Sequence, residues 1–282
     1  MIGGFFVILG LEKLSERSIL SIDESFYYDN LQGVLNMFTW RPWVFTNKKA
    51  VIWDLDNTLY RITPEFGDVL DSVMAKVTIE QLGVDLDFET AKATVKESFA
   101  KYRDGGEIFY REYGVDEKKF YKAYHDNVPY ELIVPYDGLA ERLKQIPQEQ
   151  FVFTYSSHSL AEKIIEKIGL SEIFDNRIYS VEDFNHTKKN ESPEVYLQLC
   201  EAIGIAPCDC IFVDDSYSNL LYPKEIGMTT VRLFYKENSA KDKTYIDMAY
   251  NGINKFLDDF LPVVTKENYK LDSQRQMEFS KA

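Results

Sequence analysis

Short apolar runs rich in β-forming residues recur along the chain after residue 49. They occupy residues 50–53, 151–153, 210–213 and 229–233. Runs that are apolar on both faces are typical of buried strands in a parallel sheet. Between the later runs, apolar residues recur at three- and four-residue spacing, which predicts helices over 138–146, 159–168, 193–203 and 220–226. The alternation of strand and helix predicts an α/β fold with a Rossmann-like parallel sheet as its core.

The stretch 62–134 breaks this alternation because it contains no run of β-forming residues. Its helical periodicity at 69–82, 89–102 and 118–124 predicts a helical cap domain inserted after the first strand. The core is then expected to comprise 50–61 and 135–263. Residues 1–49 are predicted to form an aromatic-rich N-terminal extension of unassigned role, and 264–282 a polar C-terminal tail.

The net negative charge of the chain disfavours nucleic acids and anionic membranes as partners. The 282 residues carry 46 Asp and Glu against 32 Lys and Arg, which gives a net charge of −14 at pH 7. So acidic a surface repels nucleic-acid backbones and anionic membranes, and we expect neither as a partner. A small anionic substrate would need a local positive charge, from a metal ion or from a lysine placed beside it. The sequence does not indicate an oligomeric state.

The cysteines and the N-terminal segment indicate the cellular compartment in which the protein is expected. Cys200, Cys208 and Cys210 are too few for a disulfide framework, and we expect free thiols in a reducing compartment. The apolar run 2–11 has about half of the ~20 residues of a membrane span, and no Lys or Arg precedes it as in a secretory leader. We therefore expect a cytoplasmic protein.

Polar residues follow three of the predicted strands at their carboxyl ends. Asp54 follows the first, Thr154 the second, and Asp214 with Asp215 the third. In parallel α/β sheets, ligands bind at this edge. Asp54 and Asp56, separated by one residue just beyond a strand, can converge on one metal ion and one phosphorus atom. The competing interpretation is a turn that these side chains merely cap.

These motifs resemble those of the haloacid dehalogenase superfamily of phosphohydrolases over residues 49–261. Four markers carry the resemblance, namely Asp54-Leu55-Asp56-Asn57-Thr58, Thr154, a lysine at 188 or 189, and Val213-Asp214-Asp215-Ser216 with Asn219. Further segments are similar to the pyrimidine 5′-nucleotidase branch, namely Asn57-Thr58-Leu59-Tyr60, Tyr113-Gly114-Val115, His125-Asp126, Tyr130 and 221–228. The resemblance implies a Mg²⁺-dependent phosphatase that hydrolyses a small phosphorylated metabolite, with a nucleoside 5′-monophosphate as the expected substrate.

The resemblance also implies a role for each motif residue. Asp54 is the expected nucleophile, which forms an aspartyl-phosphate, and Asp56 is the expected general acid and then general base. Mg²⁺ is expected to be held by the side chains of Asp54 and Asp215 and by the main-chain carbonyl of Asp56. The remaining expected roles are metal binding for Asp214, phosphate binding for Thr58, Thr154 and Lys189, and support of the site from behind for Asn219.

Two positions depart from the family pattern. Related enzymes have Lys-Pro-x-Pro-Glu, and here Pro193-Glu194 matches the end of that motif while Asn190 stands where the lysine is expected. We favour Lys189 as the phosphate ligand, with Lys188 as the alternative. In addition, Tyr155-Ser156 replaces the Asn-Gly that usually follows the strand-end threonine.

Three alternatives to the phosphatase are open. A carbon–halogen hydrolase on the same fold is disfavoured by Asp56 and by the pair Asp214-Asp215, which such an enzyme does not need. A phosphomutase, or a catalytically weakened binding or regulatory protein, is also compatible with the sequence. In the cap, several residues either line a base-binding cleft or pack internally, namely His125, Tyr60, Phe66, Tyr102, Phe109, Tyr110 and Tyr113.

Overall fold

The computed structural model describes residues 42–102, 104–235 and 244–265. The chain divides into two compact units, Met1–Arg41 and Pro42–Ala282, and every described residue belongs to the second. Residues 1–41 of the predicted extension, including the apolar run 2–11, and 266–282 of the predicted tail lie outside the described residues. Among the residues that are described, no helix is both long enough and apolar enough to cross a membrane.

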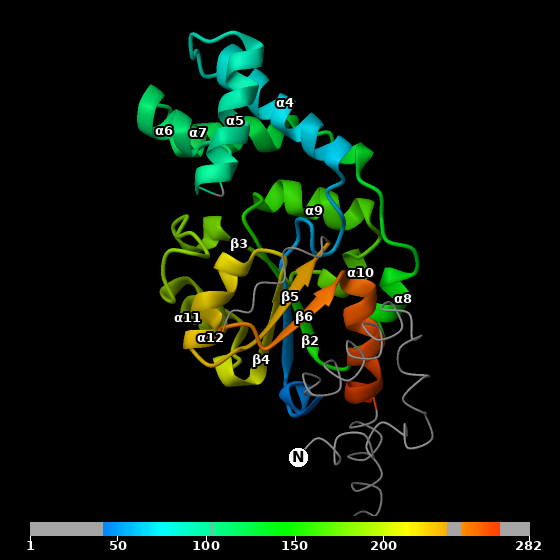
Figure 1. Cartoon of the computed structure of the whole chain (residues 1–282). Coiled ribbons are helices and arrows are strands. Elements are labelled where there is room, and N and C mark those ends of the chain that lie inside the picture. Colours follow the sequence, from blue (N-terminus) through cyan, green and yellow to red (C-terminus); the bar gives the residue numbers. More distant parts are fainter. Residues whose placement is uncertain (1–41, 103, 236–243, 266–282) are drawn as a thin grey trace, which may run out of the picture. The chain divides into compact units, whose positions relative to one another are not determined.

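In the described part of the chain, six parallel strands form one sheet in the order β3-β2-β1-β4-β5-β6 (Figure 1). The strands are β1 Ala50–Trp53, β2 Glu149–Thr154, β3 Ile178–Ser180, β4 Cys210–Asp214, β5 Thr229–Phe234 and β6 Met248–Asn251. The four predicted runs correspond to β1, β2, β4 and β5. The sequence missed β3 and β6 because these edge strands are short and only partly buried, so neither shows a distinct run of β-branched apolar residues.

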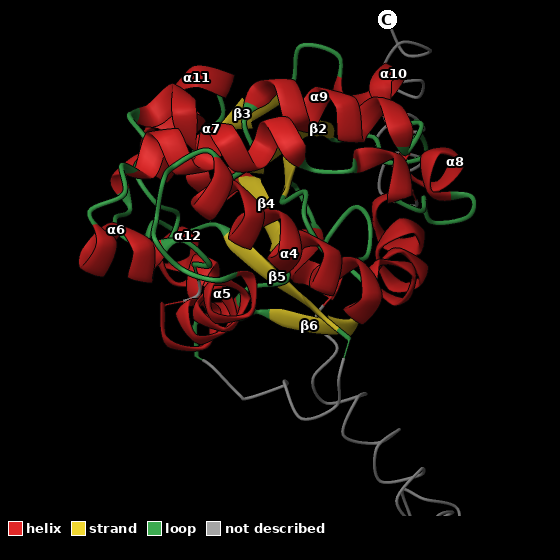
Figure 2. Cartoon of the chain, turned by 90° about the horizontal axis from the view of Figure 1, so that it is seen from above, coloured by secondary structure: helices red, strands yellow, loops and turns green. Residues whose placement is uncertain are grey.

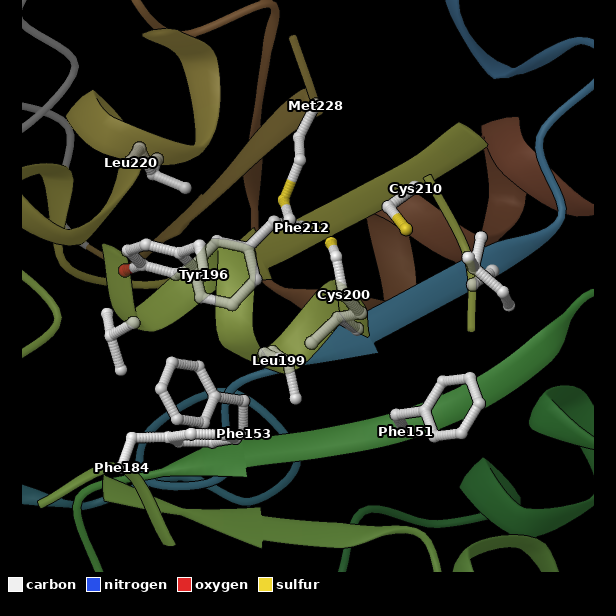
Figure 3. Close-up of a cluster of buried hydrophobic side chains, with 14 of the residues drawn as sticks. Phe151, Phe153, Phe184, Tyr196, Leu199, Cys200, Cys210, Phe212, Leu220 and Met228 are labelled. Carbon is white, nitrogen blue, oxygen red and sulfur yellow. The ribbon is translucent and has the colours of Figure 1, made fainter. Parts of the chain in front are cut away.

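Helices cover both faces of the sheet (Figure 2). On one face, Tyr196 of α11 (Glu194–Ile203) packs edge-on against Phe153 of β2 and Phe212 of β4 (Figure 3). On the other face, Trp53 of β1 meets Phe256 of a helix over 253–265. Successive side chains of a strand point to opposite faces, so two covered faces account for the complete burial of β1.

The remaining core helices connect the strands. They are α8 Leu139–Leu143, α9 His158–Lys167, α10 Ser171–Phe174 and α12 Leu221–Glu225, with short 3₁₀ helices η1 Pro42–Phe45, η2 Tyr130–Leu132, η3 Val181–Phe184, η4 Pro207–Asp209 and η5 Tyr217–Leu220. The side chain of Ser157 caps α9 by accepting a hydrogen bond from the backbone N–H of Leu160. Helix α11 ends at Gly204, whose φ of 71° lies in the left-handed region that glycine adopts without strain. The predicted α/β fold is confirmed.

Between β1 and β2 in the sequence, η2 and α8 are preceded by four α-helices, namely α4 Pro64–Glu80, α5 Phe88–Tyr102, α6 Glu107–Tyr113 and α7 Glu117–Asn127 (Figure 1). We call α4–α7 the cap. Its helices enclose a small core of their own, made of Met74, Val95, Phe109 and Phe120. The sequence predicted an inserted helical segment but missed α6, because a helix of seven residues offers too few positions to show a period.

Candidate active site

The carboxyl ends of β1, β2 and β4 carry the predicted site residues. Asp54 follows β1, Thr154 ends β2, and Asp214 and Asp215 lie at the end of β4. Because β1 pairs in register with both β2 and β4, these ends lie side by side. Carboxylate oxygens of Asp54, Asp214 and Asp215 lie within 4.8 Å of one another. The strand order therefore assembles three carboxylates, which we call the acidic cluster.

Burial dominates the electrostatics of the acidic cluster. Burial raises the pKa of Asp54 to about 7, a rise that Lys189 opposes and Asp214 reinforces. Burial also raises the pKa of Asp215 to about 7, with a further contribution from the charge of Asp54. The pKa of Asp214 rises to about 6, again through burial first. Three carboxylates beside one buried ammonium leave an excess of negative charge, and their oxygens are the ligands that Mg²⁺ prefers.

Lys189 is the cation of the acidic cluster. Its side chain is fully buried, and its Nζ atom donates hydrogen bonds to Asp54 Oδ1 at 2.6 Å and to Asp214 Oδ2 at 3.4 Å. Although burial opposes it, the charges of these two carboxylates raise the pKa of Lys189. The ammonium also lies over the rings of Phe153 and Phe212, at 5.1 and 5.7 Å from their centroids. Lys189 is therefore held as a cation beside Asp54.

Lys188, the alternative that the sequence left open, lies elsewhere. Its Nζ atom forms ion pairs with three cap carboxylates, Glu107 at 2.9 Å, Asp104 at 3.2 Å and Glu117 at 3.5 Å. The preceding residues Asn185 and His186 both have φ near 60°, so the chain reverses direction just before the two lysines. The structure therefore places Lys189 in the acidic cluster and Lys188 against the cap.

Tyr155, one of the two departures from the family pattern, contacts the lysine segment. Its hydroxyl accepts a hydrogen bond from the backbone N–H of Lys189 at 2.7 Å and donates one to Asn190 Oδ1 at 3.4 Å. Its ring also lies 5.4 Å below the Lys189 ammonium. The two departures therefore meet in space, because the tyrosine after β2 supports the segment in which the lysine is displaced by one residue.

Asp56 is held by three hydroxyl groups. Tyr60 donates to Asp56 Oδ1 at 2.5 Å, and Ser156 and Thr154 donate to Asp56 Oδ2 at 2.9 and 3.3 Å. Burial, followed by the charge of Asp56, raises the pKa of Tyr60, so this phenol stays a donor. The sequence pointed to Thr154 but missed Tyr60 and Ser156 as partners of Asp56. The four-residue spacing of Tyr60 from Asp56 was the available signal.

Three further side chains orient the acidic cluster. Thr58 donates from Oγ1 to Asp54 Oδ2 at 3.0 Å, and Asn57, with a φ of 60°, donates from Nδ2 to Asp215 Oδ2 at 2.7 Å. Asn219 donates from Nδ2 to both oxygens of Asp214, at 3.2 and 3.1 Å. Asn219 thus holds the Asp214 carboxylate, whereas Thr58, expected to bind phosphate, uses its hydroxyl proton on Asp54.

A cavity of about 660 Å³ opens from the acidic cluster toward the cap. Asp54, Asp56 and Asp215 line it on the core side. Apolar and aromatic residues of α4, α5 and α7 line it on the cap side, namely Leu70, Met74, Phe99, Tyr102, Phe120, Tyr121 and Tyr124. Such a volume is typical of a site for a small molecule.

Only some of the residues that the sequence proposed for a base-binding cleft line this cavity. Tyr60, Tyr102 and His125 line it. Phe66, Phe109, Tyr110 and Tyr113 are absent from the lining, and Phe109 packs instead on Phe120 in the cap core. The sequence missed Tyr121 and Tyr124, although Tyr124 and His125 follow Tyr121 by three and four residues on α7, which places both beside Tyr121 on the helix surface.

Residues 48–227 match the family of haloacid dehalogenase-like hydrolases. N-acetylmuramic acid 6-phosphate phosphatase of Pseudomonas aeruginosa is 26% identical over 194 residues, which cover 66% of this chain and 82% of that protein. Phosphoglycolate phosphatase of Pasteurella multocida is 23% identical over 232 residues, or 78% of this chain and 98% of that protein. Flavin mononucleotide hydrolase 1 of Arabidopsis thaliana is 32% identical over 108 residues, or 38% of this chain and 43% of that protein.

A solved structure of CbbY from Rhodobacter sphaeroides in complex with phosphate has the same fold. Its TM-score is 0.54 at 20% sequence identity, over 73% of this chain and 94% of that chain. The family match covers more than half of the chain, from before β1 to beyond α12. It includes all the residues of the acidic cluster. The chain belongs to the haloacid dehalogenase-like hydrolases.

Proposed function

We propose that this chain is a Mg²⁺-dependent phosphatase that hydrolyses a small phosphomonoester through a phosphorylated Asp54. The observation that carries the proposal is the acidic cluster around Lys189, whose Nζ atom lies 2.6 Å from Asp54 and 3.4 Å from Asp214. Family membership and the phosphatase names of the relatives support it. A carboxylate nucleophile, an acid–base group and a fixed positive charge, the parts that phosphoryl transfer needs, occur together here.

The acidic cluster fits a divalent cation. The side chains of Asp54, Asp214 and Asp215 and the main-chain carbonyl of Asp56 would hold Mg²⁺. The raised pKa values of all three buried carboxylates support this, because each marks negative charge that the protein alone leaves uncompensated. When bound, Mg²⁺ supplies positive charge between the Asp54 carboxylate and the substrate phosphate.

Asp54 is the group placed to attack phosphorus. Thr58 and Lys189 each hold one of its oxygens, so the carboxylate has a fixed orientation. Attack by one of these oxygens breaks the bond from phosphorus to the leaving-group oxygen and forms the aspartyl-phosphate. Lys189 then lies beside the transferred phosphoryl group, where its charge offsets the negative charge of the phosphoryl oxygens.

Asp56 is the group placed to move protons. It gives its proton to the departing oxygen of the leaving group, and then takes one from the water that attacks the aspartyl-phosphate. Inorganic phosphate leaves and Asp54 is regenerated. Tyr60 and Ser156 hold the Asp56 carboxyl group toward the cavity, so that it keeps one position for both proton transfers.

The expected substrate is a nucleoside 5′-monophosphate. The cavity has room for one, and the cap side offers Tyr102, Tyr121 and Tyr124 as surfaces for a flat base. The motifs shared with the pyrimidine 5′-nucleotidase branch agree with this substrate.

Phosphate release from nucleoside monophosphates and from p-nitrophenyl phosphate tests the proposal. We expect Mg²⁺ to support turnover and EDTA to stop it. Asp54→Asn should lose activity by about 10⁴-fold or more, whereas the exposed control Asp85→Asn should keep it. Beryllofluoride with Mg²⁺ should bind the wild-type protein and not Asp54→Asn. Retained activity in Asp54→Asn would refute the nucleophile, and product that keeps its phosphate would indicate a phosphomutase.

A further inference from the structure

The cap side of the cavity carries polar groups that the proposed chemistry does not use. Asp71 on α4 and the neighbours Tyr124 and His125 on α7 line the cavity together. None of them belongs to the acidic cluster. A polar group on the wall of an otherwise apolar cavity is suited to fix the orientation of a ligand.

Asp71 is a half-buried carboxylate with unused acceptor capacity. Its side chain is 18% exposed, and it accepts no hydrogen bond from any residue within the described ranges. Lys96 forms an ion pair with Asp71 at 4.0 Å but donates its hydrogen bond to Asp68 at 3.0 Å. A carboxylate removed from water without a hydrogen-bond donor is costly, so a donor from a ligand would be stabilising here.

Asp104 is the other cap carboxylate in the lining, and both of its oxygens already accept hydrogen bonds. Its Oδ1 atom accepts from the backbone N–H of Gly106, and its Oδ2 atom accepts from Tyr121 and Lys188. Asp104 therefore holds the loop between α5 and α6 together. Of the two acidic residues on the cap side of the cavity, Asp71 is the one available to a ligand.

His125 offers a donor on the same side. Its Nδ1 atom accepts a hydrogen bond from the backbone N–H of Ser157 at 3.2 Å, so the proton of the neutral ring lies on Nε2. Burial lowers the pKa of His125, which keeps the ring neutral. The Nε2 atom meets no hydrogen-bond partner among the described residues. The pKa of Tyr124, which lines the same cavity, is raised by burial and then by the charges of Asp56 and Asp71.

The described cap residues that line the cavity supply no positive charge to it. Among the described lining residues, those from 62–134 include two aspartates and neither Lys nor Arg. Lys188 enters from the core, and its ammonium is engaged by Glu107, Asp104 and Glu117. Arg232 also enters from the core, where it donates to the main-chain oxygen of Asp215 at 3.5 Å. A second anionic group on a substrate would therefore face Asp71 without a cation from the described cap residues to pair with it.

We propose that Asp71 and His125 select the leaving group of the substrate: it donates a hydrogen bond to Asp71, accepts one from His125 and carries no negative charge beyond the phosphate. This inference rests on the proposed phosphatase activity and narrows its substrate class. It separates this chain from the relatives named as phosphoglycolate phosphatases, because phosphoglycolate carries a carboxylate as its second group. A leaving group with hydroxyl or amino donors fits the site.

Three phenyl phosphates of equal size test the selection, namely 4-(aminomethyl)phenyl, 4-(hydroxymethyl)phenyl and 4-carboxyphenyl phosphate. They present a cation, a neutral donor and an anion to the cap side, on an aromatic ring that suits its aromatic lining. For the wild-type protein with Mg²⁺, we expect kcat/KM for the 4-carboxyphenyl ester to lie about tenfold or more below the values for the other two esters. Phosphoglycolate should be a poorer substrate than phosphoethanolamine for the same reason.

Asp71→Asn isolates the residue responsible. It should bring the three values of kcat/KM to within about threefold of each other, mainly by raising the value for the carboxylate ester. Asp68→Asn is the matched control, since Asp68 lies on the same helix, is exposed and is absent from the cavity lining. Asp68→Asn should keep the wild-type order. Melting temperatures of both variants establish that they fold.

The outcomes separate the two proposals. If the wild-type protein hydrolyses none of the three esters, nor p-nitrophenyl phosphate, the phosphatase activity itself is refuted. If it hydrolyses all three equally, or prefers the carboxylate ester, the selection is refuted while the phosphatase stands. An unchanged order in folded Asp71→Asn would likewise remove Asp71 from the role, whatever the wild-type preference.

Discussion

On the core side of the cavity, each carboxylate accepts a hydrogen bond or an ion pair from a neighbouring side chain, whereas on the cap side Asp71 and His125 Nε2 meet no hydrogen-bond partner among the described residues. The core-side pairs are Asp54 with Thr58 and Lys189, Asp56 with Tyr60 and Ser156, Asp214 with Asn219, and Asp215 with Asn57. In the proposed mechanism, the groups that take part in bond making would thus be fixed before the substrate arrives. Asp71 and His125, the groups proposed for recognition, would form their hydrogen bonds with the substrate.

Removal of the proton-transfer group should have the largest effect of the variants that probe this contrast. Asp56→Asn keeps the shape of the side chain and its hydroxyl donors but cannot transfer a proton, so kcat should fall by about 10²–10⁴-fold. Stopped-time phosphate release measures the loss. A leaving group that needs no proton, such as p-nitrophenolate, should reduce the loss, and an equal loss on all substrates would argue against the acid role.

Neutralisation of the core cation should have the next largest effect. Lys189→Met should lower kcat by about 10²–10³-fold, because it removes a fixed charge beside the transferred phosphoryl group. It also leaves Asp54 and Asp214 without their buried ammonium, so the metal-free variant should melt at lower temperature. Lys188→Met is the matched comparison, one residue away. Equal losses of kcat in the two variants would show that the core and cap lysines do not differ as we infer.

The excess of negative charge on the core side should appear as a pH dependence of stability in metal-free protein. The pKa values of Asp54 and Asp215 are raised to about 7, whereas unfolded carboxylates titrate near about 4. The folded state therefore binds more protons between these values, and its stability falls as pH rises through this window.

The expected loss in EDTA is on the order of 2 kcal/mol between pH 5 and pH 8, as read from urea midpoints. Asp215→Asn should flatten the slope, and the exposed control Asp85→Asn should keep it. Added Mg²⁺ should stabilise the protein more at pH 8 than at pH 5. A slope that is the same in wild type and Asp215→Asn would contradict the charge excess.

The smallest effect should come from the ion pairs between Lys188 and the cap. These pairs are partly exposed, and each is worth roughly 0.2–1 kcal/mol, so Lys188→Met should raise KM several-fold and change kcat by less than about tenfold. Lys119→Met, which removes an exposed lysine of α7, serves as the control. A change confined to kcat would mean that Lys188 acts on the chemistry rather than on the position of the cap.

The core side was predictable from sequence because its signals are local. A buried apolar run ending in an acid marks a strand and its functional end together, and parallel pairing then brings Asp54 and Asp214 side by side. The sequence could not decide which of the two lysines, Lys188 or Lys189, lies in the acidic cluster. Lys188 and Lys189 are adjacent and chemically identical, and the choice between them depends on the backbone path, which includes positive φ at Asn185 and His186 and the hydrogen bond from the Lys189 N–H to Tyr155.

The cap side was less predictable because packing assigns its residues. Phe109 and Tyr102 look alike in the sequence, yet Phe109 fills the core of the cap while Tyr102 lines the cavity. Asp71 has no motif around it, and its position on the cavity wall follows from how α4 packs against its neighbours. The edge strands β3 and β6 escaped prediction for a similar reason, since partial exposure removes the apolar run that marks a central strand.

The position of the cap helices in the chain has a consequence for how this family can change. Strands β1 and β2 are neighbours in the sheet, and α8 alone supplies the single helix that a crossover between parallel strands requires. Helices α4–α7 are therefore not required for the connection between β1 and β2. They form a segment inserted into that crossover. We expect that a change in the length of this inserted segment would leave the register of β1 with β2 and β4 unchanged.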